Sequence, residues 1–201
     1  MRKKFGLWTV MAGFAALVCA AQAFALSDVF KDNVYNPGEM KAVDSVLKVK
    51  IGDKTPDFTL PAISGQKISL QQFRGKKNVV ISFVPAAWTP VCSDQWPGYS
   101  IARELFESHD AVLLGISVDN IPTLYSWTRQ MGDIWFEVLS DFWPHGAVAD
   151  SFGVLRSDGV SERAIFVIDK QGIIRLAHVD DINKRPELGM IVRTLEEINK
   201  K

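Results

Sequence analysis

The order of apolar and polar segments predicts an α/β fold with a mixed central β-sheet and helices on both faces. Residues 78–84 and 111–118 are apolar without polar alternation, as expected for strands buried on both faces. Each is followed by a segment with helix signals, and the C-terminal part contains a hairpin around the turn 169–172. Strand–helix–strand–helix followed by a hairpin and a last helix is typical of a sheet covered on both sides.

The first residues predict a secretory signal. Residues 1–4 are positively charged, residues 5–20 are apolar, and small residues follow at the spacing of a signal-peptidase site. We therefore expect a cleaved signal peptide at residues 1–25 and an exported protein, most simply in a bacterial periplasm. The apolar stretch approaches the ~20 residues that span a bilayer, so a retained N-terminal membrane anchor is the alternative.

The rest of the chain is expected to form one domain, residues 51–201, preceded by an N-terminal extension, residues 26–50. The extension contains a turn signal at 36–38, and a short helix is expected within 40–47. The chain has 23 basic and 23 acidic residues, and this balance gives no basis for nucleic-acid binding.

The elements of the domain follow from local patterns. The expected strands are 57–60 and 67–70 as a hairpin around Ser64-Gly65, then 78–84, 111–118, and 164–168 with 173–177 as a second hairpin. The expected helices are a segment from Pro90 to about 108, then 122–131, a short one within 143–152, and the amphipathic segment 187–199.

One cysteine lies at the junction between the strand 78–84 and the helix that follows. Thr89 suits the N-cap, where its hydroxyl would accept a bond from a free backbone N–H, and Pro90 suits the first helical position. Cys92 is then the third helical residue, where the helix N-terminus favours thiolate over thiol. The sequence therefore predicts a reactive cysteine; the alternative is an inert cysteine packed as a small apolar residue.

The cysteine count limits the chemistry. The chain has 2 cysteines, and Cys19 lies in the predicted signal peptide. The exported protein would retain Cys92 alone, which cannot form an internal disulfide. Any oxidised form of Cys92 must then be reduced by a thiol from outside the chain.

The junction resembles the peroxiredoxin signature, and with it the thioredoxin-like fold. Pro85, Thr89 and Cys92 have the Pro-x-x-x-Thr-x-x-Cys spacing, with a threonine where thioredoxins carry the first cysteine of Cys-x-x-Cys. Residues 52–60 and 161–169 are similar to the family's opening and to its arginine-bearing segment, and residues 139–148 resemble the one-cysteine alkyl hydroperoxide reductase E type.

The resemblance implies a site and a reaction. Cys92 would be the peroxidatic cysteine, surrounded by Pro85, Thr89 and Arg163, and a hydroperoxide would convert it to a sulfenic acid. A thioredoxin-, glutaredoxin- or mycoredoxin-like protein, or a small thiol, would regenerate it, and a homodimer is expected. No cofactor is implied, and the three histidines share no metal-ligand spacing.

Several alternatives stay open. The chain could be an exported thiol–disulfide oxidoreductase or a non-catalytic binding module on the same fold. Arg163 could simply pair with Glu162, and Pro97 should weaken the helix after Cys92. Core packing is the expected use of Trp88 and Trp96, which flank the cysteine, with an apolar substrate pocket as the alternative. Core packing is also expected for Phe142 and Trp143, with a dimer contact as the alternative. Trp88 also replaces a more usual phenylalanine, and residues 93–95 lack the glutamate often found three residues past the cysteine.

Overall fold

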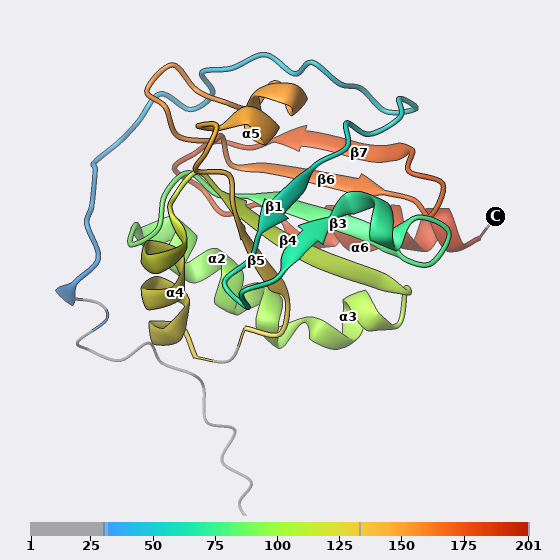
Figure 1. The fold of residues 1–201 in the computed structure, drawn as a ribbon, viewed down its shortest axis with the longest axis horizontal. Helices are drawn as coiled ribbons and strands as arrows, with labels where there is room; N and C mark the ends of the chain where they lie inside the picture. The colour runs from blue at the N-terminus through green and yellow to red at the C-terminus, as the bar shows by residue number, and fades with distance from the viewer. Residues whose placement is uncertain (1–29, 31, 133, 201) are drawn as a thin grey trace, which may run out of the picture.

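The computed structural model describes residues 30, 32–132 and 134–200 (Figure 1). The predicted signal peptide and its membrane-anchor alternative lie outside these residues. In the described part of the chain, no helix has the length and apolar character needed to cross a membrane. The predicted α/β fold with a mixed central sheet is confirmed.

The central sheet has five strands in the order β5-β4-β3-β6-β7. β3 pairs in parallel with β4, and β4 with β5, whereas β6 runs antiparallel to both β3 and β7. The strands are β3 (Asn78–Phe83), β4 (Ala111–Ser117), β5 (Glu137–Ser140), β6 (Ala164–Ile168) and β7 (Ile174–Val179). Every residue of β3 is buried, as its mainly apolar sequence without polar alternation predicts for the strand at the centre.

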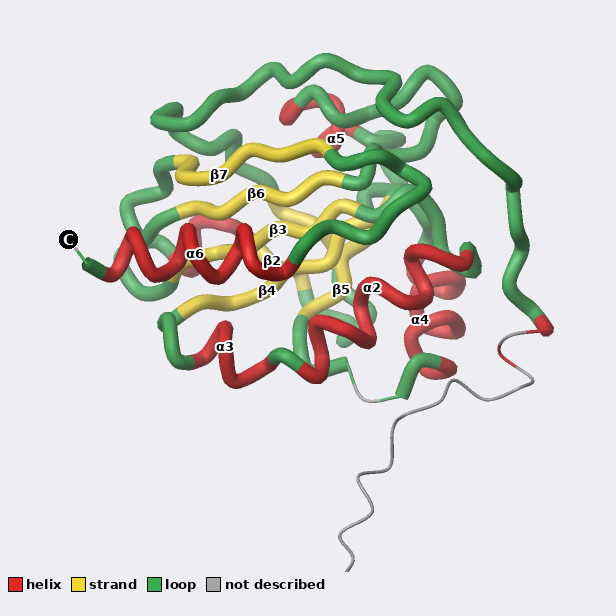
Figure 2. Tube along the Cα trace, turned by 180° about the vertical axis from the view of Figure 1, so that it is seen from behind, coloured by secondary structure: helices red, strands yellow, loops and turns green. Residues whose placement is uncertain are grey.

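Two layers cover the sheet. One face packs against α2 (Pro90–Ile101), α4 (Ile121–Gln130) and α6 (Leu188–Asn199), with α3 (Arg103–Glu107) beside them (Figure 2). The other face packs against α5 (Ala147–Phe152) and the predicted hairpin of β1 (Thr59–Pro61) and β2 (Lys67–Ser69), which is followed by a short 3₁₀ helix, Leu70–Phe73. Side chains alternate between these layers along β3: Val80 belongs to the first core, Ile81 to the second.

The helix after the cysteine differs from the prediction in its C-terminal part. It begins at Pro90 as expected and continues past Pro97, but it ends at Ile101. Ala102 has φ −88° and ψ 15°, outside the helical region, and α3 then starts as a separate helix. The helical segment is therefore interrupted at Ala102, five residues beyond Pro97.

The predicted helix within residues 40–47 is wrong. This segment is extended, because its backbone bonds to the domain instead of to its own turns: Met40 N–H donates to Asn183 Oδ1 and Lys48 N–H to the Phe152 carbonyl. Figure 1 shows the blue to cyan segment before β1 running along the outside of the molecule. Residues 35–48 of the extension are thus bound to the surface of the domain.

Candidate active site

The strand register brings two distant parts of the chain to one edge of the sheet. Phe83, the last residue of β3, pairs with Ala164, the first residue of β6. Residues just after β3 and just before β6 must then lie side by side, and Ser161 Oγ donates to the Val84 carbonyl at 2.8 Å. This register places Arg163 next to the loop that leads to Cys92.

The Arg163 guanidinium contacts the sulfur directly. Its Nη2 lies 3.4 Å from Cys92 Sγ, within the range of a hydrogen bond to sulfur. Arg163 is 2% exposed and Cys92 is 0% exposed, so the contact is shielded from water. A guanidinium is permanently cationic, and its attraction for a thiolate is stronger in a buried site than in solvent.

Two acceptors hold the guanidinium in place. The Ile182 carbonyl accepts from Arg163 Nε at 3.1 Å and from Nη2 at 3.0 Å. The Gln95 side-chain oxygen accepts from Nη1 at 2.5 Å. Both acceptors are neutral, and no carboxylate of the described residues forms an ion pair with Arg163. Its positive charge is therefore not cancelled by a fixed anion.

Gln95 connects the arginine to a buried polar network. It is fully buried on α2, one turn beyond the cysteine, and its amide nitrogen donates to Ser82 Oγ at 3.0 Å and to the Tyr99 hydroxyl at 3.3 Å. Burial raises the pKa of Tyr99, so the phenol stays neutral. In the sequence, Gln95 is notable only as a position without the usual glutamate; in the structure it is one of the two acceptors that orient Arg163.

Glu162 is not the partner of Arg163. Its carboxylate is fully buried and pairs with Arg156, with Nη1 and Oε2 2.8 Å apart. Burial acts to lower the pKa of Arg156, but the hydrogen bond and charge of Glu162 outweigh it, and the pKa is raised. The alternative that Arg163 merely pairs with its neighbour is wrong, because adjacent residues of an extended strand point to opposite sides.

Thr89 occupies the N-cap position without the predicted cap bond. Its hydroxyl donates to the Ala86 carbonyl at 2.9 Å, and no backbone N–H of the helix donates to it. Because its proton is used in this bond, the hydroxyl oxygen can only accept from a bound molecule. Pro90 takes the first helical position and Cys92 the third, as expected.

A cavity of about 600 Å³ opens beside the cysteine. Its wall includes three of the predicted site residues, Pro85, Thr89 and Arg163, and Val91 next to the cysteine. Cys92 itself does not line the cavity, but its sulfur contacts Arg163, which does. The structure therefore brings together the four predicted site residues, three of them in the wall of one cavity and the fourth in contact with that wall.

Comparison with known proteins identifies the family. The AhpC/TSA family model matches residues 51–177. The chain belongs to the AhpC/TSA family. The predicted family and the thioredoxin-like fold are both confirmed, and membership supports thiol-dependent peroxide reduction as the chemistry of the site.

Relatives in the AhpC/TSA family cover most of the domain. Alkyl hydroperoxide reductase E of Mycobacterium tuberculosis (strain ATCC 25618 / H37Rv) is 40% identical over 132 residues, 65% of this chain and 86% of the relative. A chloroplastic 2-cysteine peroxiredoxin of Chattonella marina var. antiqua is 31% identical over 161 residues, 76% of this chain and 82% of the relative. The structure of reduced Plasmodium vivax 2-Cys peroxiredoxin has a TM-score of 0.70 and 28% identity, covering 76% of this chain and 83% of that one.

The aromatic residues near the AhpC/TSA site have different environments. Trp96 is fully buried against Trp127, with ring centroids 5.0 Å apart, so its core role is confirmed. Phe142 and Trp143 are 48% and 82% exposed, so the prediction of core packing is wrong for both. Trp88 is half-buried and has φ +60°, a conformation that costs of order 1–3 kcal/mol for a bulky residue.

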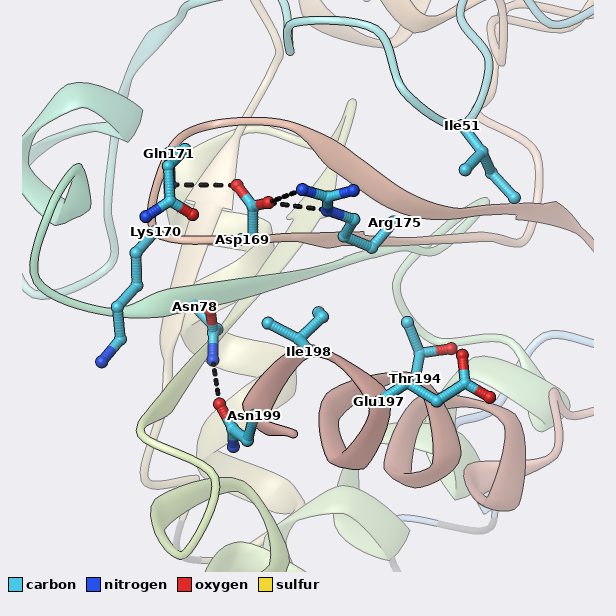
Figure 3. Close-up of a pocket in the computed structure, with 10 residues that line it drawn as sticks. All are labelled: Ile51, Asn78, Asp169, Lys170, Gln171, Arg175, Thr194, Glu197, Ile198 and Asn199. Atoms are coloured by element: carbon cyan, nitrogen blue, oxygen red, sulfur yellow. Dashed lines mark hydrogen bonds and ion pairs between the residues drawn. The ribbon is translucent and has the colours of Figure 1, made fainter. Parts of the chain in front are cut away.

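A second cavity, of about 580 Å³, lies at the opposite end of the sheet and contains none of these residues (Figure 3). It lies between the turn after β6, the C-terminal part of α6 and the start of β3, with Asp169, Asn78 and Asn199 in its wall. Asn78 begins β3, whereas Cys92 follows the end of that strand, so the strand's length separates this cavity from the AhpC/TSA site.

Proposed function

We propose that this protein is a one-cysteine peroxidase that reduces hydrogen peroxide and small organic hydroperoxides at Cys92. The observation that carries the proposal is the 3.4 Å contact between Arg163 Nη2 and Cys92 Sγ beside the cavity. A relative 40% identical over 132 residues is named alkyl hydroperoxide reductase E, which supports a peroxide as substrate.

The reaction uses the thiolate of Cys92 as nucleophile. The sulfur attacks the nearer peroxide oxygen, a new S–O bond forms, the O–O bond breaks, and the farther oxygen leaves as hydroxide or alkoxide. Sulfur is oxidised by two electrons to the sulfenic acid, and the peroxide is reduced to water or an alcohol. Arg163 stabilises the thiolate and the charge that moves onto the peroxide oxygens.

Thr89 and Pro85 would orient and shield the reacting atoms. The Thr89 hydroxyl already donates to Ala86, so it would accept the peroxide proton's hydrogen bond and hold the substrate with one oxygen toward the sulfur. The backbone N–H of Cys92, in the first turn of α2, would donate to the other oxygen. Pro85 is buried in the cavity wall and would keep bulk water from the sulfenic acid.

Regeneration would use an outside thiol. Cys92 is the sole cysteine of the described residues, so no resolving cysteine lies within them. The thiol displaces water from the sulfenic acid to give a mixed disulfide, and a second thiol then releases Cys92 and leaves as a disulfide with the first. Since Cys92 is fully buried, the first turn of α2 would have to open to admit a protein reductant.

The buried sulfur favours a peroxidase over a disulfide oxidoreductase. Hydrogen peroxide is small enough to enter the cavity beside Arg163. The disulfide of a folded protein could reach Cys92, which has 0% of its surface exposed, only after the first turn of α2 opens. A peroxidase would need this opening only for regeneration, whereas an oxidoreductase would need it for each reaction with its substrate.

The test is stopped-flow tryptophan fluorescence of the reduced protein mixed with hydrogen peroxide. We expect oxidation much faster than that of free cysteine, and its loss in Cys92→Ser. Oxidation no faster than that of free cysteine would overturn the proposal.

A second experiment identifies the class of reductant: mass spectrometry of oxidised Cys92 with candidate thiols added in turn.

Location and assembly are separate parts of the proposal. We propose that residues 1–25 direct export to a periplasm. N-terminal sequencing of the protein from the periplasmic fraction would test this, and an intact signal in the membrane fraction would support the membrane anchor instead.

The exposed Phe142 and Trp143 side chains suit a homodimer contact. Replacing Trp143 by Ser should convert a dimer to a monomer in light scattering.

A further inference from the structure

Residues 33–44 form an extended segment that we call the strap. The strap lies outside residues 51–177, the part that the AhpC/TSA family model matches. It belongs to the blue segment that precedes β1 in Figure 1. The strap therefore precedes the matched part of the chain.

The strap is fixed on both sides of the cavity beside Cys92. At its start, Tyr35 N–H donates to the Trp88 carbonyl at 2.7 Å. Farther on, Met40 and Asn183 exchange two hydrogen bonds, Met40 N–H to Asn183 Oδ1 at 2.9 Å and Asn183 Nδ2 to the Met40 carbonyl at 2.8 Å. Trp88 precedes α2 and Asn183 follows Ile182, so the part of the strap between these bonds spans the cavity.

The end of the strap is bound more tightly. The Ile182 N–H donates to the Ala42 carbonyl at 3.0 Å, and the Asp44 N–H donates to the buried Glu162 carboxylate at 2.5 Å. Asp44 also accepts from the Ser157 N–H at 2.9 Å. These bonds hold residues 40–44 against the domain in one position.

One of these bonds links the strap to the reacting centre. The Ile182 carbonyl accepts from Arg163, and the Ile182 N–H donates to the Ala42 carbonyl. Arg163 in turn contacts the Cys92 sulfur. The strap and the guanidinium are thus bound by the two successive peptide groups that flank the Cα of Ile182.

The strap also supplies one wall of the cavity. Tyr35, Pro37 and Met40 line it from the strap, facing Pro85, Val91 and Ile182 of the domain. A volume of about 600 Å³ is within the range of small-molecule sites, whereas one water occupies only about 30 Å³ in the liquid. The cavity is therefore much larger than hydrogen peroxide needs, and both of its walls carry apolar side chains.

We propose that the strap is the specificity-determining wall of the active site, and that it binds the apolar organic group of a hydroperoxide whose reacting end lies at Arg163 and Thr89. This inference rests on the proposed peroxidase function. The apolar group would lie along Met40, leaving the reacting oxygens at the inner end of the cavity. Each methylene buried there should raise the second-order rate constant by up to about fourfold.

The experiment measures Cys92 oxidation by a series of n-alkyl hydroperoxides, from ethyl to octyl, in the full chain. We expect the rate constant to rise at least tenfold along the series in the wild type, and the rise to shrink at least threefold in Met40→Ala. Val46→Ala is the matched control, because Val46 is 83% exposed and lies outside the cavity wall; it should keep the wild-type rise. Met40→Gln keeps the side-chain length and the backbone bonds, so it repeats the test if Met40→Ala folds poorly.

Two failures can be told apart. If hydrogen peroxide does not oxidise Cys92 in the wild type, the peroxidase function itself is wrong. If hydrogen peroxide oxidises Cys92 but the alkyl series is flat, or Met40→Ala follows the wild type, the function stands and the role of the strap is overturned.

Discussion

Because Gln95 is neutral, we expect it to orient Arg163 without reducing the stabilisation that the guanidinium gives to the Cys92 thiolate. Gln95 Oε1 lies 2.5 Å from Arg163 Nη1, and Nη2 of the same guanidinium lies 3.4 Å from Cys92 Sγ. Gln95→Glu changes one atom, keeps the shape of the side chain and places a carboxylate on the far side of the guanidinium. We expect this charge to disfavour the thiolate of Cys92.

The two contacts set the size of the effect. Adding them across the width of the guanidinium places the new carboxylate within about 8 Å of the sulfur, where two negative charges repel by at least about 2 kcal/mol at an effective dielectric constant of 20. A repulsion of about 2 kcal/mol corresponds to a factor of about 30 in an equilibrium constant. Where the thiol form predominates in both proteins, oxidation of Gln95→Glu should therefore be about 30-fold slower than that of the wild type.

The assay is the rate of Cys92 oxidation by hydrogen peroxide, measured by stopped flow from acid to alkaline pH. Gln95→Glu should regain the wild-type rate at high pH, because the thiolate is then formed in both proteins. Gln66→Glu adds the same charge at an exposed turn, so it controls for net charge and should keep the wild-type profile. Gln95→Met removes the hydrogen bond without adding charge.

Oxidation of Gln95→Glu as fast as that of the wild type, or faster, at acid pH would refute this reasoning. It would mean that a charge beside Arg163 does not affect the reactivity of Cys92. A loss of rate of the same size at every pH, shared by Gln95→Met, would indicate misplacement of Arg163 instead of a charge effect.

Three further predictions concern charge and packing. Arg163→Met should slow Cys92 oxidation by up to roughly a few thousandfold, since the attraction lost at this distance is about 5 kcal/mol at a dielectric constant of 20. Arg163→Lys should lose less, and equal rates in stopped flow would contradict this. Gly115→Ala should lower the thermal midpoint, because its Cβ would lie 2.7 Å from the Trp96 ring, and overpacking costs about 1–3 kcal/mol; calorimetry that finds no loss would refute it. Hydrogen bonding from Lys41 lowers the pKa of Asp44 below its ordinary 3.8, so the ionised group stabilises the fold above that pH and the benefit is lost as pH falls further. The difference in thermal midpoint between wild type and Asp44→Asn should therefore be constant near neutral pH and shrink below about 3.8, and a difference that grows in acid would contradict it.

Much of the fold could be predicted because its signals are local. The apolar runs of β3 and β4 and the turn between β6 and β7 are continuous in the sequence, and each forms the predicted element. β5 was missed, since its four residues, Glu137–Ser140, are too few to show a pattern. Its strand conformation comes from pairing with β4, which a local pattern does not contain.

Only the parts of the site that have a characteristic side chain or a family motif could be predicted. Cys92 was recognised from its place at a helix start and Arg163 from the resemblance of residues 161–169 to the family's arginine-bearing segment, and the register of β3 and β6 brings the two together. The Ile182 carbonyl and the strap were not predicted, because a backbone acceptor can come from any residue and leaves no mark in the sequence. The cap expected at Thr89 was wrong, because the hydroxyl donates to the Ala86 carbonyl and does not accept from a helix N–H. The residue type alone does not decide between these two hydrogen bonds.

The central claim is that Cys92, activated by Arg163, reacts with a hydroperoxide to form a sulfenic acid. The most direct test treats the reduced protein with one equivalent of hydrogen peroxide in the presence of dimedone, followed by peptide mass spectrometry. The account predicts one dimedone adduct per chain, on Cys92, and its near absence in Arg163→Met after the same short exposure. An unmodified Cys92 in the wild type, or an equal yield in both proteins, would contradict it.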